Sequence, residues 1–167
     1  MPRTSAGLLP WRRRADGGGL EVFVARMGGP FWQGREAGAW SIVKGELTLG
    51  EEPLAAALRE FGEETGLAIA GPFVPLTPVR QAAGKLVIAY AVEAPGLDPA
   101  LVRSSTFPVE WPRGSGRVTR YPEIERAAWL APAEPRGLIV KGQVALHDEL
   151  ESRLLGGAAS RTEGQRP

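Results

Sequence analysis

The chain of 167 residues is 43% hydrophobic and 23% charged, which is the balance of one soluble globular domain with its own core. A formal net charge of +1 and the lack of an apolar run of about 18 residues argue against an extensive nucleic-acid surface and a membrane span. The absence of cysteine excludes disulfides, thiolate metal sites and a cysteine nucleophile. We therefore expect a cytoplasmic protein.

Two short apolar runs near the start of the chain predict strands over residues 5–11 and 20–26, separated by a glycine-rich turn. A stretch rich in glycine and proline follows and ends in a short apolar piece at residues 40–43. The position of an aromatic residue in a strand or in a loop indicates whether it lies in the core. We expect Trp40, at the start of a strand, to lie in the core.

The next segment is the clearest helix of the sequence. Pro53 fits the first turn, where its missing N–H costs nothing, and Gly66 is a natural terminator in the left-handed conformation. Leu54, Leu58 and Phe61 fall on one apolar stripe at 100° per residue. One side of this helix is therefore expected to be buried.

The rest of the chain predicts a mixture of strands and helices. Two strands flank residues 83–84, and the stronger one covers 85–93. Residues 95–122 are rich in Pro, Gly and Arg without a period, which indicates a functional or mobile loop. A final strand is predicted at 127–131. The C-terminal helices are predicted at 132–140 and 142–155. The pattern favours a mixed α/β layered domain.

Three carboxylates crowd the last turn of the central helix. Glu60, Glu63 and Glu64 share one arc of the helix surface, where both the helix dipole and mutual repulsion oppose negative charge. A solvated acidic face gains nothing from this crowding. A hard divalent cation reverses the sign of each unfavourable contribution, because Mg²⁺ binds carboxylate oxygens together with substrate phosphates.

The spacing of these residues resembles the Nudix box, which reads Gly, five residues, Glu, seven residues, Arg-Glu-apolar-any-Glu-Glu-any-Gly-apolar. Gly45, Glu51 and the run from Arg59 to Leu67 match every fixed position. The resemblance implies the Nudix α/β/α sandwich with a mixed β-sheet, as a single domain over residues 3–155. The composition of residues 156–167 predicts a disordered tail. The flanking segments are similar to a bacterial group described only as predicted nucleoside-triphosphate pyrophosphohydrolases.

The resemblance implies hydrolysis of a nucleoside diphosphate linked to another group, with Mg²⁺ or Mn²⁺ as cofactor. It makes Glu60 and Glu64 metal ligands, Glu63 a ligand or the general base, and the backbone carbonyl of Gly45 a further ligand. Arg59 is expected to orient these glutamates.

Two more carboxylates join these candidates outside the last turn of the helix. Glu51 is expected to pair with Arg59. Glu123 falls where many relatives carry an additional acidic group near the metals, and the alternative is a surface glutamate at a loop end. Either one is a candidate extra ligand or base.

The substrate most in keeping with these residues is a nucleoside or dinucleoside polyphosphate. Loop aromatics stack on bases, and lysine and arginine contact phosphates. The candidate substrate-binding residues are Lys44, Arg80, Trp32, Trp111, Arg113 and Arg117. The alternatives are ADP-ribose, RNA 5′ ends, or a nucleotide sensor without turnover. The only expected partner is the small-molecule nucleotide, and the protein is expected to be a monomer or homodimer.

Overall fold

A computed structural model describes residues 3–131 and 137–163 of the chain. Within these residues, eight strands form one mixed sheet and two further strands form a separate hairpin. The strands are β1 Thr4–Arg13, β2 Leu20–Met27, β3 Trp40–Ser41, β4 Val43–Glu46, β5 Val74–Pro75, β6 Val79–Arg80, β7 Leu86–Glu93, β8 Thr106–Glu110, β9 Val118–Pro122 and β10 Ile124–Leu130. The helices are α1 Pro53–Thr65 and α2 Val144–Glu163, with short 3₁₀ turns η1 Pro30–Trp32, η2 Ala82–Gly84, η3 Pro99–Leu101 and η4 Lys141–Gln143.

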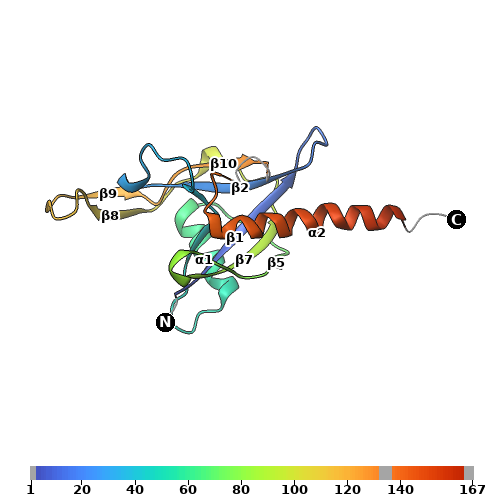
Figure 1. Cartoon of the computed structure of the whole chain (residues 1–167), viewed down its shortest axis with the longest axis horizontal. Coiled ribbons are helices and arrows are strands. Elements are labelled where there is room, and N and C mark those ends of the chain that lie inside the picture. Colours follow the sequence, from blue (N-terminus) through green and yellow to red (C-terminus); the bar gives the residue numbers. More distant parts are fainter. Residues whose placement is uncertain (1–2, 132–136, 164–167) are drawn as a thin grey trace.

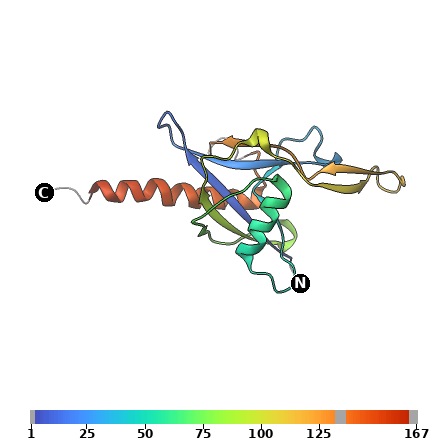
Figure 2. The same cartoon turned by 180° about the vertical axis from the view of Figure 1, so that it is seen from behind.

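The central strand of the sheet is β1. It pairs in parallel with β7 and antiparallel with β2 and β4, while β10 extends the sheet beyond β2. The two helices pack on opposite faces of this sheet, so the molecule has three layers (Figures 1 and 2). The predicted α/β/α sandwich with a mixed sheet is confirmed.

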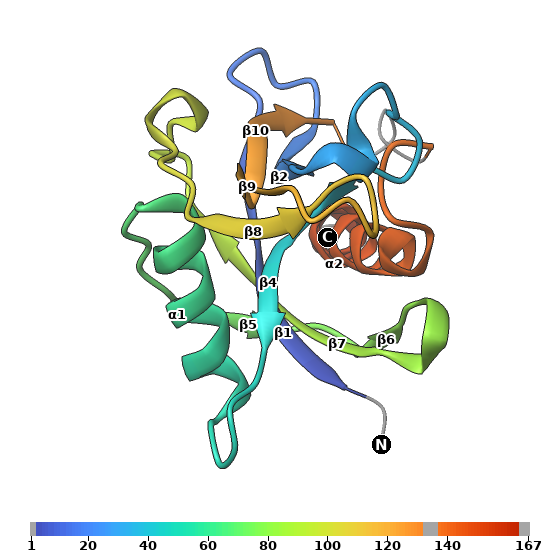
Figure 3. The ribbon, with the colours of Figure 1, turned by 90° about the vertical axis from the view of Figure 1, so that its left-hand side faces the viewer.

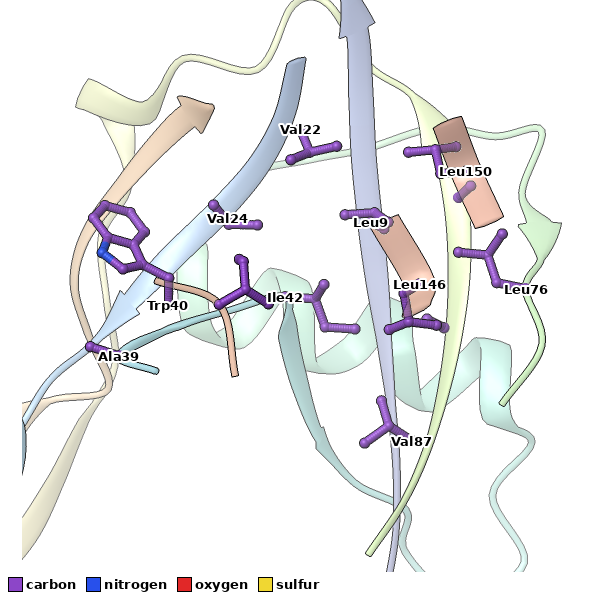
Figure 4. Close-up of a cluster of buried hydrophobic side chains, with 13 residues drawn as sticks. Leu9, Val22, Val24, Ala39, Trp40, Ile42, Leu76, Val87, Leu146 and Leu150 are labelled. Atoms are coloured by element: carbon purple, nitrogen blue, oxygen red, sulfur yellow. The ribbon is translucent and has the colours of Figure 1, made fainter. Parts of the chain in front are cut away.

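Alternation along the strands divides the core in two. Leu8 and Phe23 face α1 and pack with its buried Phe61. On the other face, Leu9 and Val22 pack with Leu146 and other residues of α2 (Figure 4). Successive side chains of a strand point to opposite faces, so β1 and β2 supply both clusters. Trp40 is buried in the α2-side cluster, as predicted.

The segment 95–122 differs from the loop predicted for it. It contains η3 and the hairpin β8–β9, which projects from the body at the opposite end from α2 (Figure 1). Gly114 and Gly116 adopt positive φ in the connecting turn, and Arg120 Nε donates to the Thr106 hydroxyl across the two strands. The hairpin gave only a weak sequence signal, because the alternation of Phe107 and Val109 in β8 is short and interrupted by Pro108, and β9 is exposed at four of its five positions.

The C-terminal region also differs in part from the prediction. Residues 137–140 are not helical, because Trp40 donates its backbone N–H to Leu138 O and Val140 returns one to Trp40 O. The rest of the helix predicted at 132–140 lies outside the described residues. The last helix begins at Val144 and continues to Glu163, into the segment expected to be a tail. Residues 164–167 are outside the described part, and the division into a 3–155 domain and a tail stays a prediction.

Candidate active site

The helix α1, which is labelled in Figure 3, carries Glu60, Glu63 and Glu64 near its C-terminal end. It begins at Pro53 and ends at Gly66, which adopts the left-handed conformation and donates its N–H to Gly62 O, as the sequence predicted. Phe61 is fully buried against the sheet. Because Phe61 fixes the rotation of the helix, its neighbours Glu60 and Glu64 are brought to the edge of the sheet beside β4.

One arginine holds three of the carboxylates. Arg59 contacts Glu51 through two bonds, Nε to Oε2 at 2.8 Å and Nη2 to Oε1 at 2.9 Å. Its Nη1 also contacts Glu60 at 2.9 Å and Glu63 at 3.2 Å. The bonds from Arg59 and from the Thr48 backbone N–H lower the pKa of Glu51 to about 2. This clamp explains how the crowded charge is tolerated in the folded chain.

Glu64 is not among the carboxylates that Arg59 contacts, and its surroundings disfavour its ionised form. Burial, followed by the charges of Glu60 and Glu123, raises the pKa of Glu64 to about 8. The pKa of Glu123 is also raised, first by burial and then by Glu60. The fold thus brings Glu123, which is distant from Glu64 in the sequence, into the same electrostatic cluster.

Close backbone approaches hold Glu123 and Glu60 in place. Gly28 donates its N–H to Glu123 O at 2.9 Å, and a β-carbon at residue 28 would stand 1.9 Å from Pro122 O. A β-carbon at Gly45 would stand 2.0 Å from the carboxyl carbon of Glu60. Gly28 is therefore required by packing against backbone, whereas a side chain at Gly45 would displace the end of Glu60, which lies directly over this glycine.

The donor set fits a hard divalent cation, although it is not assembled as a closed cage. In the described parts of the chain, no three acidic or histidine side chains are gathered closely enough to hold a metal ion as they stand. Glu60 and Glu63 are turned toward Arg59. Yet Glu64 is disfavoured as an anion by its carboxylate neighbours, and a divalent cation removes that penalty.

Two neighbouring cavities lie in this region, and the smaller one is lined by two of the carboxylates. A small cavity of about 130 Å³ is lined by Glu64 and Glu123 together with Met27, Ser41 and Lys44. A larger cavity of about 800 Å³ shares Met27, Ser41 and Lys44 with it and extends away from the carboxylates. Burial, followed by the charge of Lys85, lowers the pKa of Lys44 to about 8. Lys44, which lines both cavities, is therefore half-buried.

The predicted substrate-binding residues separate into two groups. Lys44, Arg80 and Trp32 all line the larger cavity. Trp111, Arg113 and Arg117 instead occupy or flank the turn of the projecting hairpin and are not among the residues that line either cavity. Their assignment as substrate-binding residues stays a prediction.

A buried arginine that the sequence did not assign to the site also shapes the large cavity. Arg26 is 5% exposed and donates from Nη2 to Trp32 O and Arg35 O, both at 2.7 Å, while Glu36 and Glu125 balance its charge. Arg26 therefore fixes the backbone of the segment that carries Trp32. A single charged residue near the end of the apolar run 20–26 was the only signal for this role.

The chain resembles known proteins in both sequence and structure. The NUDIX domain family model matches residues 1–150. A solved structure of a C. elegans Ap4A hydrolase binary complex is similar, with a TM-score of 0.64 and 18% identity over 91% of this chain and 98% of that one. A mutT/nudix family protein from Listeria innocua gives a TM-score of 0.62 with 14% identity over 95% and 98% of the two chains. No curated protein sequence matches the chain.

A third similar structure is the NUDIX domain of Shewanella oneidensis NrtR complexed with ADP ribose, with a TM-score of 0.59 and 13% identity over 92% of this chain and 89% of that one. These likenesses show a common fold. The chain belongs to the Nudix family, and it is a Nudix hydrolase, an enzyme of the class that cleaves phosphoric anhydride bonds. Hydrolases of this family generally use divalent metals. No helix in the described residues is long and apolar enough to cross a membrane.

Proposed function

We propose that the enzyme is a Mg²⁺- or Mn²⁺-dependent pyrophosphohydrolase of nucleoside or dinucleoside polyphosphates. The observation that carries this proposal is that the two cavities are neighbours, with Met27, Ser41 and Lys44 in the lining of both. A nucleotide whose base occupies the large cavity would extend its phosphates past Lys44 toward Glu64 and Glu123. The cytoplasmic location and the monomeric or homodimeric state expected from the sequence belong to this proposal.

The carboxylates provide the metal ligands in this proposal. Glu60 and Glu64 hold the metal, with Glu63 as a further ligand or base and the Gly45 carbonyl completing the set. When bound, the metal neutralises the diphosphate and increases the acidity of a coordinated water. With the metal bound, Arg59 would give up its hydrogen bond to Glu60 and keep its two bonds to Glu51.

The cationic residues bind and orient the phosphates. Lys44 donates to a phosphate oxygen at the junction of the cavities, where its burial strengthens the interaction. Arg80 lines the larger cavity and is available to the part of the substrate that occupies it. Glu123 is a candidate to accept a proton from the attacking water, since its raised pKa makes it a stronger base than an ordinary carboxylate.

A substrate panel tests the function. Wild-type protein and Glu64→Gln are assayed with nucleoside triphosphates, dinucleoside polyphosphates, ADP-ribose and RNA bearing a 5′-triphosphate, each with Mg²⁺, with Mn²⁺ and with EDTA. We expect turnover of nucleoside or dinucleoside polyphosphates that requires metal and falls at least about 10²-fold in Glu64→Gln. Turnover of ADP-ribose or RNA ends alone would replace the proposed substrate class, and binding without turnover would indicate a sensor.

A further inference from the structure

The buried side chain of Gln143 connects three segments that form one wall of the large cavity. Its Oε1 accepts the backbone N–H of Ile42 at 3.0 Å. Its Nε2 donates to the Ser41 hydroxyl at 2.9 Å and to Gln81 Oε1 at 2.8 Å. Gln143 is 0% exposed, and its bonds to Ile42 and Ser41 are buried, while the bond to Gln81 is partly buried. Both N–H groups of its amide are used.

This network determines which way each amide points. A backbone N–H can only donate, so Ile42 holds the oxygen of Gln143 and turns the NH₂ group of Gln143 toward Gln81. An NH₂ group also can only donate, so Gln81 turns its oxygen toward Gln143. The NH₂ group of Gln81 is left over, and within the described residues it has no hydrogen-bond partner. Gln81 lines the large cavity.

The backbone around Gln81 is held firmly in place. Gln81 donates its N–H to Lys85 O at 2.8 Å, and Gly84 donates to Gln81 O at 3.1 Å, which closes the turn around η2. A β-carbon at Gly142 would stand 2.7 Å from Arg80 O and 2.9 Å from the α-carbon of Gln81. The turn is thus packed directly against the segment that leads into α2, and Figure 3 shows it beside the start of that helix.

The other groups of the cavity complement a flat base that carries acceptors. Trp32, Met27 and Val140 supply apolar surface. Lys44, Arg80 and Lys141 are hydrogen-bond donors only. The Ser41 hydroxyl donates to Ile42 O and accepts from Gln143, so its proton is already used. The side chains of the cavity therefore offer donors and few free acceptors.

We propose that the Gln81 amide makes the enzyme prefer nucleotides whose base carries a keto oxygen, namely guanine, hypoxanthine or uracil, over the amino bases adenine and cytosine. This inference rests on the proposed function and specifies its substrate. The NH₂ group of Gln81 donates to O6 of a purine or O4 of uracil. The amino group of adenine or cytosine is itself a donor at that position, so it would face the NH₂ group of Gln81 and neither group would have a hydrogen-bond acceptor. Reading adenine with glutamine uses the amide oxygen as acceptor, and that oxygen is turned toward Gln143.

The test compares pairs of substrates that differ at this position of the base. We expect kcat/KM to be about tenfold higher for ITP than for ATP, and for UTP than for CTP. In Gln81→Glu, one carboxylate oxygen keeps the bond from Gln143 and the other offers an acceptor to the cavity, so the preference should reverse. Gln81→Ala should remove it. Gln33→Glu is the matched control, since Gln33 is exposed and outside the cavity lining.

Melting temperatures within a few degrees of wild type would show that the Gln81 variants fold. Equal kcat/KM for keto and amino bases, unchanged in Gln81→Glu, would overturn the inference and leave the proposed hydrolase function intact. Absence of nucleotide turnover in wild type would overturn the proposed function instead. In that case the dissociation constants of ITP and ATP for wild type decide the inference: tighter ITP binding supports it and equal binding overturns it.

Discussion

The carboxylate of Glu60 lies directly against the α-carbon of Gly45. A β-carbon at residue 45 would stand 2.0 Å from the carboxyl carbon and 2.2 Å from Oε2. The glycine also sits on β4, paired with Ala6 of the central strand, so its backbone cannot retreat without disturbing the sheet. Any side chain at residue 45 must therefore displace the end of Glu60.

Gly45→Ala is predicted to impair the site while preserving the fold. Because the displaced atoms are the end of a flexible side chain, the melting temperature should change by only a few degrees. We expect kcat/KM to fall about 10²-fold, since a shift of about 1 Å in a positioned group has that effect. Stabilisation by Mg²⁺ should weaken in parallel, as measured by thermal melts over a metal titration.

Gly62→Ala is the control for that substitution, because Gly62 lies on the exposed side of α1, where an added β-carbon would meet no neighbouring atom within 4 Å. It should stabilise the protein by about 0.5–1 kcal/mol and leave kcat/KM within twofold. Full activity in Gly45→Ala would show that the carboxylate of Glu60 does not need its observed position.

The helix and its acidic cluster could be predicted from the sequence because their signals are local. Pro53, Gly66 and the apolar stripe fix the helix, and the spacing of the carboxylates carries the family resemblance. The cavity wall could not be predicted, since Ser41, Gln81 and Gln143 come from three distant segments. Their contact depends on strand pairing and on the packing of η4 against β6, which no short-range period encodes.

Arg59 is predicted to require its planar guanidinium. It forms two bonds with Glu51 and one each with Glu60 and Glu63, a pattern that an ammonium group cannot reproduce. We expect Arg59→Lys to lower kcat at least about tenfold with a smaller change in KM, because the carboxylates lose their orientation. Steady-state kinetics would measure this. Arg3→Lys is the control, since the pair Arg3–Glu46 is highly exposed. Equal kcat in wild type and Arg59→Lys would contradict the role.

The metal-free protein is predicted to lose stability as the pH rises. The pKa of Glu64 is raised from about 4.5 to about 8, so the folded state retains a proton that the unfolded state releases above about pH 4.5. The free energy of unfolding should therefore decline between about pH 5 and pH 8 and then level off. Denaturant titrations in EDTA measure this slope. In Glu64→Gln the slope should flatten, and the variant should be more stable than wild type by about 1–3 kcal/mol at pH 8.

Stabilisation by Mg²⁺ should increase with pH, whereas the stability of the metal-free protein should decrease. Because the cation and the proton compete for the Glu64 carboxylate, stabilisation by Mg²⁺ should be larger at pH 8 than at pH 5 in wild type and small at both in Glu64→Gln. Glu93→Gln, an exposed change at the end of β7, should behave as wild type. A wild-type protein whose stability is the same from pH 5 to pH 8 in EDTA would show that Glu64 is an ordinary carboxylate.

Two tryptophans distinguish the cavity from the hairpin as the place where a base binds. Trp32 lines the large cavity and is held there by the bond from Arg26 to its carbonyl oxygen, whereas Trp111 is 44% exposed at the turn of the hairpin. Loss of a stacking aromatic costs about 1–3 kcal/mol per base. We therefore expect Trp32→Ala to raise KM for a nucleoside triphosphate about tenfold or more, and Trp111→Ala to leave it within twofold.

A dinucleoside polyphosphate extends the comparison, because its second base reaches further from the carboxylates than any part of a mononucleotide. If the hairpin binds that second base, Trp111→Ala should raise KM for the dinucleotide alone, and Arg113→Ala and Arg117→Ala should do the same. An effect of Trp111→Ala on mononucleotides as large as that of Trp32→Ala would place the first base on the hairpin, since Trp32 lines the large cavity and Trp111 does not. The cavity between Trp32 and Gln81 would then serve another part of the substrate.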